Sequence, residues 1–220
     1  MKKITFSRLW RPLAAGIVIL ELAACSTLRA GAPSPPAIYA LEAARGSAAP
    51  TTVPAAASAK APTLIVNRPH ASAGFDSPRI IYVREAHKLE YFAHSEWVDP
   101  PARMLAPLLV SALQNTGAFR AVLLAPSSAA ADLRLDTEII RLQHEFLAQP
   151  SRVRFTLRAY LVEDQTRRVL AWREFDLSVP SASEDPYGGV VAANQAVHTA
   201  LESLAAFCAE GATRGWSNEQ

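Results

Sequence analysis

Ser151-Arg-Val-Arg-Phe-Thr-Leu-Arg-Ala-Tyr-Leu-Val162 is the stretch of this 220-residue chain that decides the fold. One side chain in two is apolar, which is the period of a β-strand with one buried face. The apolar set is Val153, Phe155, Leu157, Ala159 and Leu161, and the opposite set is Arg152, Arg154, Thr156, Arg158 and Tyr160. The flanking segments 132–146 and 168–179 also have the composition of long strands, and the polar residues 163–167 supply a turn. The sequence therefore predicts a three-stranded meander.

Shorter strands and two helices are predicted around this meander. The strands are 64–66, 79–84, 88–93 and 119–124, and the second and third form a hairpin around Glu85-Ala86-His87. One helix opens at Asp99-Pro100-Pro101 with Asp99 as the expected cap and ends at Gly117; Pro107 inside it implies a kink or a later start. Helical spacing predicts a second helix over 186–210. The fold class is α+β, a mostly antiparallel twisted sheet with two main helices packed on one face.

The N-terminus has the layout of a secretory signal. Residues 1–11 carry four basic side chains, residues 13–20 are apolar, and Leu22-Ala23-Ala24-Cys25 follows. The apolar run is too short to cross a bilayer, for which about 20 residues are needed. Cys25 after two small residues resembles the bacterial lipobox, which implies a signal peptide over 1–24 and covalent N-acyl and S-diacylglycerol groups at Cys25. Ser26 favours the outer membrane by resemblance to sorted lipoproteins. The alternative is an ordinary signal cut nearby, with Cys25 incidental.

The rest of the chain divides by composition. Residues 25–37 are predicted to be a tether, and 38–62 form an Ala/Pro-rich segment in which Ile38–Leu41 is compatible with a short strand that docks on the domain. Residues 63–210 form the folded domain, and 211–220 a polar C-terminal tail.

Charge content gives no support for nucleic-acid binding, and cysteine content gives no support for an intrachain disulfide. The leader holds four of the 22 basic and one of the 20 acidic residues, which leaves 18 bases against 19 acids in the mature chain. No electrostatic case for nucleic acid remains. If Cys25 is lipidated, Cys208 has no disulfide partner, and its apolar helical surroundings predict a buried free thiol.

The chain carries no recognisable catalytic or metal-binding pattern. Its five histidines lack metal-site spacing and are expected at the surface or at strand edges. There is no nucleophile elbow, phosphate-binding loop or dinucleotide fingerprint, so we expect no catalytic residues, no metal and no enzyme activity. Arginines on the polar face of the middle strand are expected to pair with acids on its neighbours, and the alternative is a patch for lipid headgroups or a partner's acids. The arginines are Arg152, Arg154 and Arg158, and the acids are Asp136, Glu138, Glu174 and Asp176.

Aromatic residues crowd the region of the predicted hairpin. About half of them should point into the core because side chains alternate along a strand. The remainder, with the prolines that follow, could form an exposed patch for a protein partner. The predicted partner-binding residues are Tyr82, Tyr91, Trp97 and Pro100. A core position for Trp97 is the alternative.

Several of these segments together resemble the ABC-type transport auxiliary lipoproteins, the group that contains the paraquat-inducible-operon lipoprotein. The matching segments are Tyr39-Ala40-Leu41, Pro78-Arg79-Ile80-Ile81-Tyr82, Leu89-Glu90-Tyr91-Phe92, Glu96-Trp97-Val98-Asp99-Pro100-Pro101, Met104-Leu105, Leu133-Arg134-Leu135 and Ala171-Trp172-Arg173-Glu174-Phe175. The resemblance covers nearly the whole mature chain and makes 63–210 the auxiliary lipoprotein domain.

The resemblance implies a non-catalytic accessory component that faces the periplasm. Its partners would be an ABC permease, an ATPase and a membrane-anchored substrate-binding protein of the mammalian-cell-entry type, in a system that moves lipids or other hydrophobic compounds between two membranes. The alternative is an outer-membrane assembly or envelope-stress lipoprotein without a transporter partner. Whether the chain forms a homo-oligomer stays open.

Overall fold

The computed structural model describes residues 35–42 and 60–216 of the chain. The expected leader 1–24, Cys25 and the tether as far as residue 34 lie outside these residues, as do 43–59 and 217–220. The elements are β1 (Ala37–Tyr39), β2 (Thr63–Val66), β3 (His70–Ala71), β4 (Arg79–Glu85), β5 (Lys88–Trp97), α2 (Pro101–Gln114), β6 (Ala121–Leu124), β7 (Leu133–Glu145), β8 (Arg152–Glu163), β9 (Val169–Pro180) and α3 (Pro186–Trp216).

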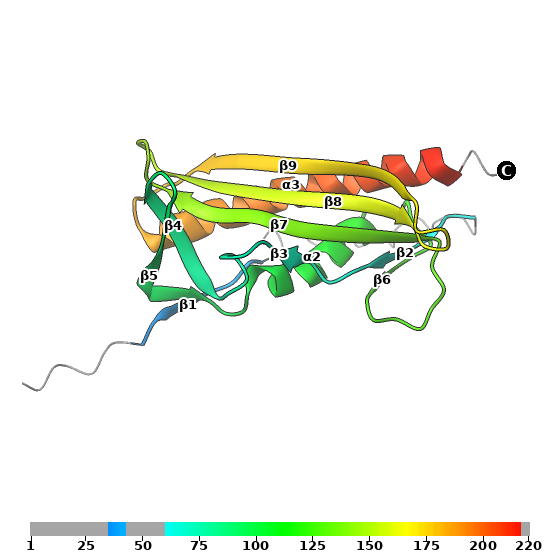
Figure 1. The fold of residues 1–220 in the computed structure, drawn as a ribbon, viewed down its shortest axis with the longest axis horizontal. Coiled ribbons are helices and arrows are strands. Elements are labelled where there is room, and N and C mark those ends of the chain that lie inside the picture. The colour runs from blue at the N-terminus through cyan, green and yellow to red at the C-terminus, as the bar shows by residue number, and fades with distance from the viewer. Residues whose placement is uncertain (1–34, 43–59, 217–220) are drawn as a thin grey trace, which may run out of the picture. The chain divides into compact units, whose positions relative to one another are not determined.

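The predicted meander is confirmed as β7, β8 and β9, the three long strands that run across Figure 1. All three pair antiparallel, with Leu135 opposite Leu161 in one ladder and Leu157 opposite Phe175 in the other. β8 has the two faces that the sequence predicts, and its apolar set points into the core. Phe155, Leu157 and Leu161 are completely buried.

The other edge of β7 pairs with three short strands in succession. β2, β3 and β4 each add to it in parallel, and β6 extends the sheet beyond β2. β4 and β5 form the predicted hairpin, although β5 is longer than expected and ends at Trp97. β1 then pairs in parallel with the end of β5; it covers residues 37–39, whereas the sequence places the possible short strand at 38–41. The longest ladders are antiparallel, and the α+β class is confirmed.

Both described helices lie on one face of the sheet, behind the strands in Figure 1. α3 covers β8 and β9, whereas α2 packs beside it against β2, β3 and β6. The buried face of α3 consists largely of small side chains, which let the helix approach the sheet closely. They include Ala192, Ala193, Ala196, Ala200 and Ala205. Cys208, on the same face, is the buried free thiol that the sequence predicts.

Both helices depart from their predicted ends. Asp99 does not cap α2: the helix begins at Pro101, no side chain caps it, and the Asp99 carboxylate pairs with Arg103 one turn later (3.3 Å). Pro107 lies inside α2 without delaying its start. α3 continues beyond Glu210 to Trp216, so 211–216 is helical rather than a tail.

Trp97 belongs to the core, which corrects its prediction as an exposed partner-binding residue. Its side chain is only 4% exposed, and its backbone N–H donates to the Pro78 carbonyl (2.7 Å). Its side chain borders a small gap that Ile80, Leu142 and Ala193 also line. The indole therefore lies where the end of β5 meets β7 and α3. The strand ends with this side chain inward because β1 and β4 hold β5 on both sides.

Replacing Trp97 by Ala is expected to lower the free energy of unfolding by roughly 3–5 kcal/mol, because the truncation leaves a cavity in the core. Urea unfolding measures the loss. The control is Val98→Ala, since the next side chain is 61% exposed and its truncation should cost little. Equal stability of Trp97→Ala and the parent would contradict the core position.

Candidate functional site

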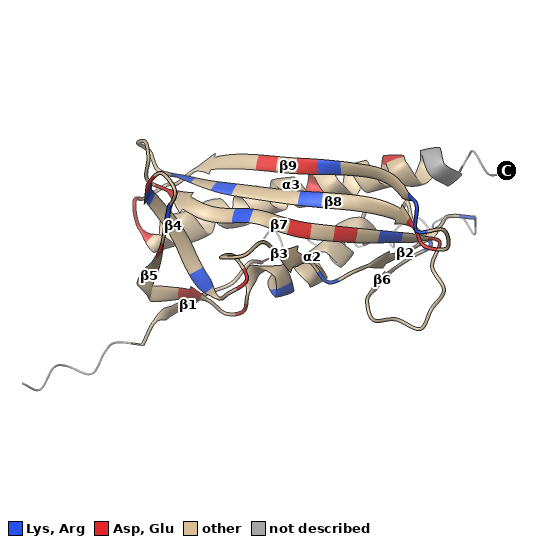
Figure 2. Ribbon diagram, in the orientation of Figure 1, with Lys and Arg blue, Asp and Glu red and all other residues tan. Residues whose placement is uncertain are grey.

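Basic and acidic positions lie on neighbouring strands of the meander in Figure 2. On the exposed face of the meander, their side chains form ion pairs that connect the strands. Arg154 pairs with Asp176 (2.6 Å), and Arg158 pairs with both Glu174 (2.9 Å) and Glu138 (3.7 Å). The hydrogen bond from Arg154 holds the pKa of Asp176 below its usual range. The cross-strand ladder is thus confirmed for these residues. A headgroup patch is disfavoured because their acids neutralise the arginines in place.

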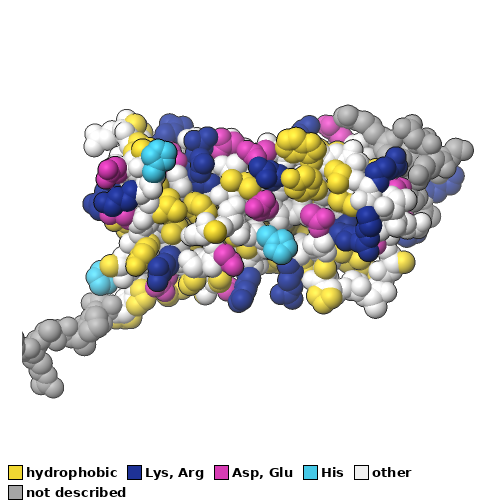
Figure 3. All heavy atoms as spheres, viewed as in Figure 1, with side chains coloured by type: hydrophobic (Ala, Val, Ile, Leu, Met, Phe, Trp, Pro, Cys, Tyr) yellow, Lys and Arg dark blue, Asp and Glu magenta, His cyan; other side chains and the backbone are white. Residues whose placement is uncertain are grey.

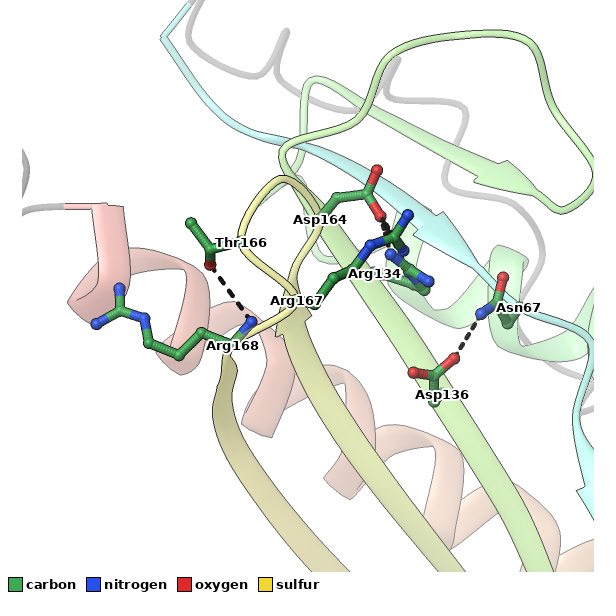
Figure 4. A network of polar contacts seen from close by, with 7 residues as sticks. All are labelled: Asn67, Arg134, Asp136, Asp164, Thr166, Arg167 and Arg168. Atoms are coloured by element: carbon green, nitrogen blue, oxygen red, sulfur yellow. Dashed lines mark hydrogen bonds and ion pairs between the residues drawn. The ribbon is translucent and has the colours of Figure 1, made fainter.

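Two members of the expected ladder bond differently. Arg152 donates to the hydroxyl and carbonyl of Ser178, and Asp136 accepts from the Asn67 amide (2.5 Å). Figure 4 shows this second contact beside the β8–β9 turn, where Arg134 and Arg167 converge on Asp164. This end of the sheet is therefore fixed by polar contacts between strands.

Large apolar side chains on the surface concentrate in a few places. Two of them lie in β9, where Trp172 stacks on Tyr160 (ring centroids 6.4 Å apart), and Figure 3 shows a hydrophobic group over β8 and β9. Most of the others lie beside the N-terminal half of α3 or on the β4–β5 hairpin.

We name the hollow beside Tyr187 and Val191 of α3 the α3 groove, and the hollow beside Leu89 and Tyr91 of the hairpin the hairpin surface.

The α3 groove is an open hollow of about 800 Å³ between β1, the residue after β5, and α3. Its exposed apolar side chains are Ile38, Val98, Tyr187 and Val191. Asn194 joins the two walls, since its Nδ2 donates to the Ala40 carbonyl (3.2 Å) and its Oδ1 accepts from the Glu42 backbone N–H (2.8 Å). The groove was not predicted, because its walls are far apart in the sequence and residues 38–42 carry little pattern of their own.

The hairpin surface is a hollow of about 610 Å³ bordered by Leu89, Tyr91, Arg79, Asp76 and Glu96. Tyr91 is 53% exposed, and the Arg79 guanidinium lies over its ring, 4.2 Å from the centroid. Such a cation–π contact holds the aromatic ring in place at the surface.

The structure separates the four predicted partner-binding residues. Tyr91 lies opposite Ile81 in the hairpin register, so it projects from the face away from Tyr82. Tyr82 is half-buried against Phe92, with ring centroids 4.5 Å apart. Pro100 is half-buried at the start of α2, and Trp97 is in the core. Of the four, Tyr91 alone presents a largely exposed ring.

His144 corrects the expectation that every histidine lies at the surface or at an edge. It is 2% exposed, and its Nε2 lies 2.8 Å from Ser151 Oγ. Its Nδ1 faces the first turn of α3, where a Cβ on Gly189 would lie 2.5 Å away. Only glycine allows the helix to approach the imidazole this closely. Burial lowers the pKa of His144, against the opposing influence of Glu184 and Asp185.

This buried pair does not form an accessible nucleophile. Ser151 is completely buried, and its backbone N–H donates to the Glu184 carboxylate (2.9 Å). Burial also raises the pKa of the Cys208 thiol to about 12. Within 35–42 and 60–216, no three side chains of metal-binding type lie together. Ser151 and Cys208 are therefore shielded from solvent, whereas the two hollows are open to it.

The fold and these surfaces define an α+β domain with two hollows near the end of β5, one lined mainly by apolar side chains and the other by apolar and charged side chains. None of the helices in the described segments is long and apolar enough to span a membrane. The family model for ABC-type transport auxiliary lipoprotein components matches residues 39–206, and the chain belongs to this family. The resemblance deduced from the sequence is thereby confirmed.

Solved structures agree with the fold. Protein XCC0632 from Xanthomonas campestris is 24% identical, with a TM-score of 0.65 over 70% of this chain and 87% of that one. An uncharacterized protein is 14% identical, with a TM-score of 0.61 over 79% of this chain and 99% of its own. None of the curated proteins matches the sequence.

The buried imidazole predicts a loss of stability in acid. Since the folded-state pKa of His144 lies below its ordinary value of 6.5, the unfolded chain binds a proton that the folded chain does not. The contribution to the free energy of unfolding is complete above about pH 7 and declines below about pH 6.5, by up to about 1.4 kcal/mol per pH unit. His144→Gln should show a shallower decline between pH 6.5 and 5 in urea unfolding. The control for losing a surface histidine is His94→Gln, and an unchanged decline in His144→Gln would contradict the prediction.

Proposed function

We propose that this protein is a non-catalytic, periplasm-facing lipoprotein that serves an ABC-type system moving lipids or other hydrophobic compounds between two membranes. Its partners are the permease and ATPase of that system and a substrate-binding protein of the mammalian-cell-entry type. The observation that carries the proposal is the family match over residues 39–206. The two hollows and their exposed apolar side chains support it, because an accessory component acts through the surfaces that it offers to other molecules.

We propose anchoring at Cys25 as the means by which the domain is held at the membrane. The sequence up to Cys25 has the order of a lipoprotein signal, and Ser26 favours the outer membrane. Three acyl chains, each stabilised by about 0.8 kcal/mol per buried methylene, exceed the two signals that stable anchoring needs. With such an anchor, the described residues need not include a membrane-spanning helix.

Cys25→Ala is expected to abolish labelling by a palmitate analogue and to move the protein from the outer-membrane fraction to the soluble periplasm. Labelling in gel and fractionation of the envelope measure both effects. Cys208→Ala is the matched control because the only other cysteine is a buried thiol, and it should label as the parent does. Equal labelling of parent and Cys25→Ala would reject the anchor.

The partner is proposed to dock on the hairpin surface rather than on the charged meander. Tyr91 carries this proposal because its ring is held by Arg79 and remains open to solvent. Exposed aromatic side chains contribute most to binding where a partner can cover them. The acids and arginines of the meander already satisfy one another, so they offer less to a partner.

Tyr91→Ala is expected to weaken capture of the mammalian-cell-entry-type protein at least tenfold, the effect of losing a residue worth roughly 1.4 kcal/mol or more. Binding is measured by pull-down with the full-length parent and variants, at equal amounts of folded protein. Trp172→Ala is the matched control, because Trp172 is 62% exposed but lies on the meander. Loss of the partner in Trp172→Ala alone would reverse the assignment. Absence of capture by the parent would reject the partnership itself.

A further inference from the structure

The walls of the α3 groove are mainly apolar, and two of its polar side chains already use their hydrogen-bonding groups within the protein. The Asn194 amide is used by Ala40 and Val190 as acceptors and by the Glu42 N–H as donor. Thr199 Oγ1 donates back to the Gln195 carbonyl of its own helix (3.1 Å). The other hydroxyl and amide side chains on the walls are Gln195, Tyr39 and Tyr187. They are too few for the many polar groups of a sugar or a peptide backbone, which are costly to leave without partners.

The charged residues on the groove walls also disfavour an anionic ligand. Among the described residues, neither lysine nor arginine lines the groove, where the acid Glu42 is the only carboxylate. His198 also lines it, but its Nδ1 lies 3.5 Å from Glu202 on the next turn of α3. A phosphate would find no lysine or arginine on these walls, whereas a hydrocarbon chain needs none. The volume of about 800 Å³ is within the range of small-ligand sites, roughly 300–1,000 Å³.

The position of the groove along the chain indicates where such a hydrocarbon comes from. The β1 wall begins at Ala37, twelve residues after Cys25, and this length of chain spans at most about 40 Å. If Cys25 is anchored as proposed above, the groove stays within that distance of the lipid headgroups. A membrane lipid is then the hydrocarbon source at the highest local concentration.

We propose that the α3 groove binds one acyl chain of a membrane phospholipid. The chain lies between Ile38 on β1 and Val191 on α3, with Tyr187 and Val98 beside it, and the headgroup stays in solvent. This site deepens the proposed function, on whose lipid anchor it rests, because it lets the accessory protein itself hold the hydrophobic end of a lipid.

Photocrosslinking tests the proposal with the full-length acylated protein in phosphatidylcholine vesicles. The probe is a phosphatidylcholine with a diazirine near the end of one acyl chain, and adducts are located by mass spectrometry. Adducts are expected on the groove residues, and Val191→Asp should reduce them roughly tenfold because a carboxylate is placed against the hydrocarbon. Val169→Asp is the matched control: both valines are largely exposed, but Val169 lies on β9 away from the groove. Ile38→Asp repeats the test from the opposite wall, and a thermal melt verifies each fold.

The outcomes distinguish an acyl-chain site from contact with the membrane surface and from a protein occupant. Groove adducts that are absent, or equal in parent and both groove variants, overturn the proposal. Equal adducts from a lipid with the diazirine on its headgroup also overturn it, because they indicate contact with the membrane surface only. Adducts displaced by a transporter protein that crosslinks to the same residues would make a protein the occupant, and this too overturns it. Capture of the mammalian-cell-entry-type protein is measured in parallel, so the proposed function can fail while lipid labelling persists.

Discussion

β7 is the element on which the rest of the structure depends, because it pairs along both edges. One edge is occupied throughout by β8, while the other receives β2, β3 and β4 in turn. Short strands of two to seven residues have little stability by themselves, and they gain it by adding to a strand that is already fixed. The hairpin and, through it, β1 therefore depend on the placement of β7.

A single extra residue in β7 determines what lies beneath the start of α3. Ile139 pairs with Leu157 and Arg141 with Thr156, so Ile140 is a bulge that reverses the alternation. Beyond it Leu142 and His144 point inward. The imidazole then faces Gly189, the helix descends onto it without a Cβ between them, and the following turns of α3 form one wall of the groove.

The sequence predicts the long elements because their patterns are regular, and it fails where pairing is local or irregular. The meander and both helices follow from periods of two and 3.6 residues. Strict alternation from Leu133 would turn His144 outward, and the Ile139-Ile140 doublet is the one signal of the bulge. Trp97 is ambiguous from sequence, since its orientation follows from β1 pairing at Tyr39, which is remote along the chain. The α3 groove needs the same remote pairing.

The last two residues of β5 and the residue after it connect the two hollows with the core. Glu96 borders the hairpin surface, Trp97 is buried, and Val98 borders the α3 groove. The Val98 N–H donates to the Tyr39 carbonyl (2.7 Å), so β1 fixes the direction in which this segment leaves the sheet. The buried indole thus fixes the backbone from which Glu96 and Val98 reach the two hollows. A change in the packing of Trp97 would therefore displace a wall residue of each hollow, although the indole itself lines neither.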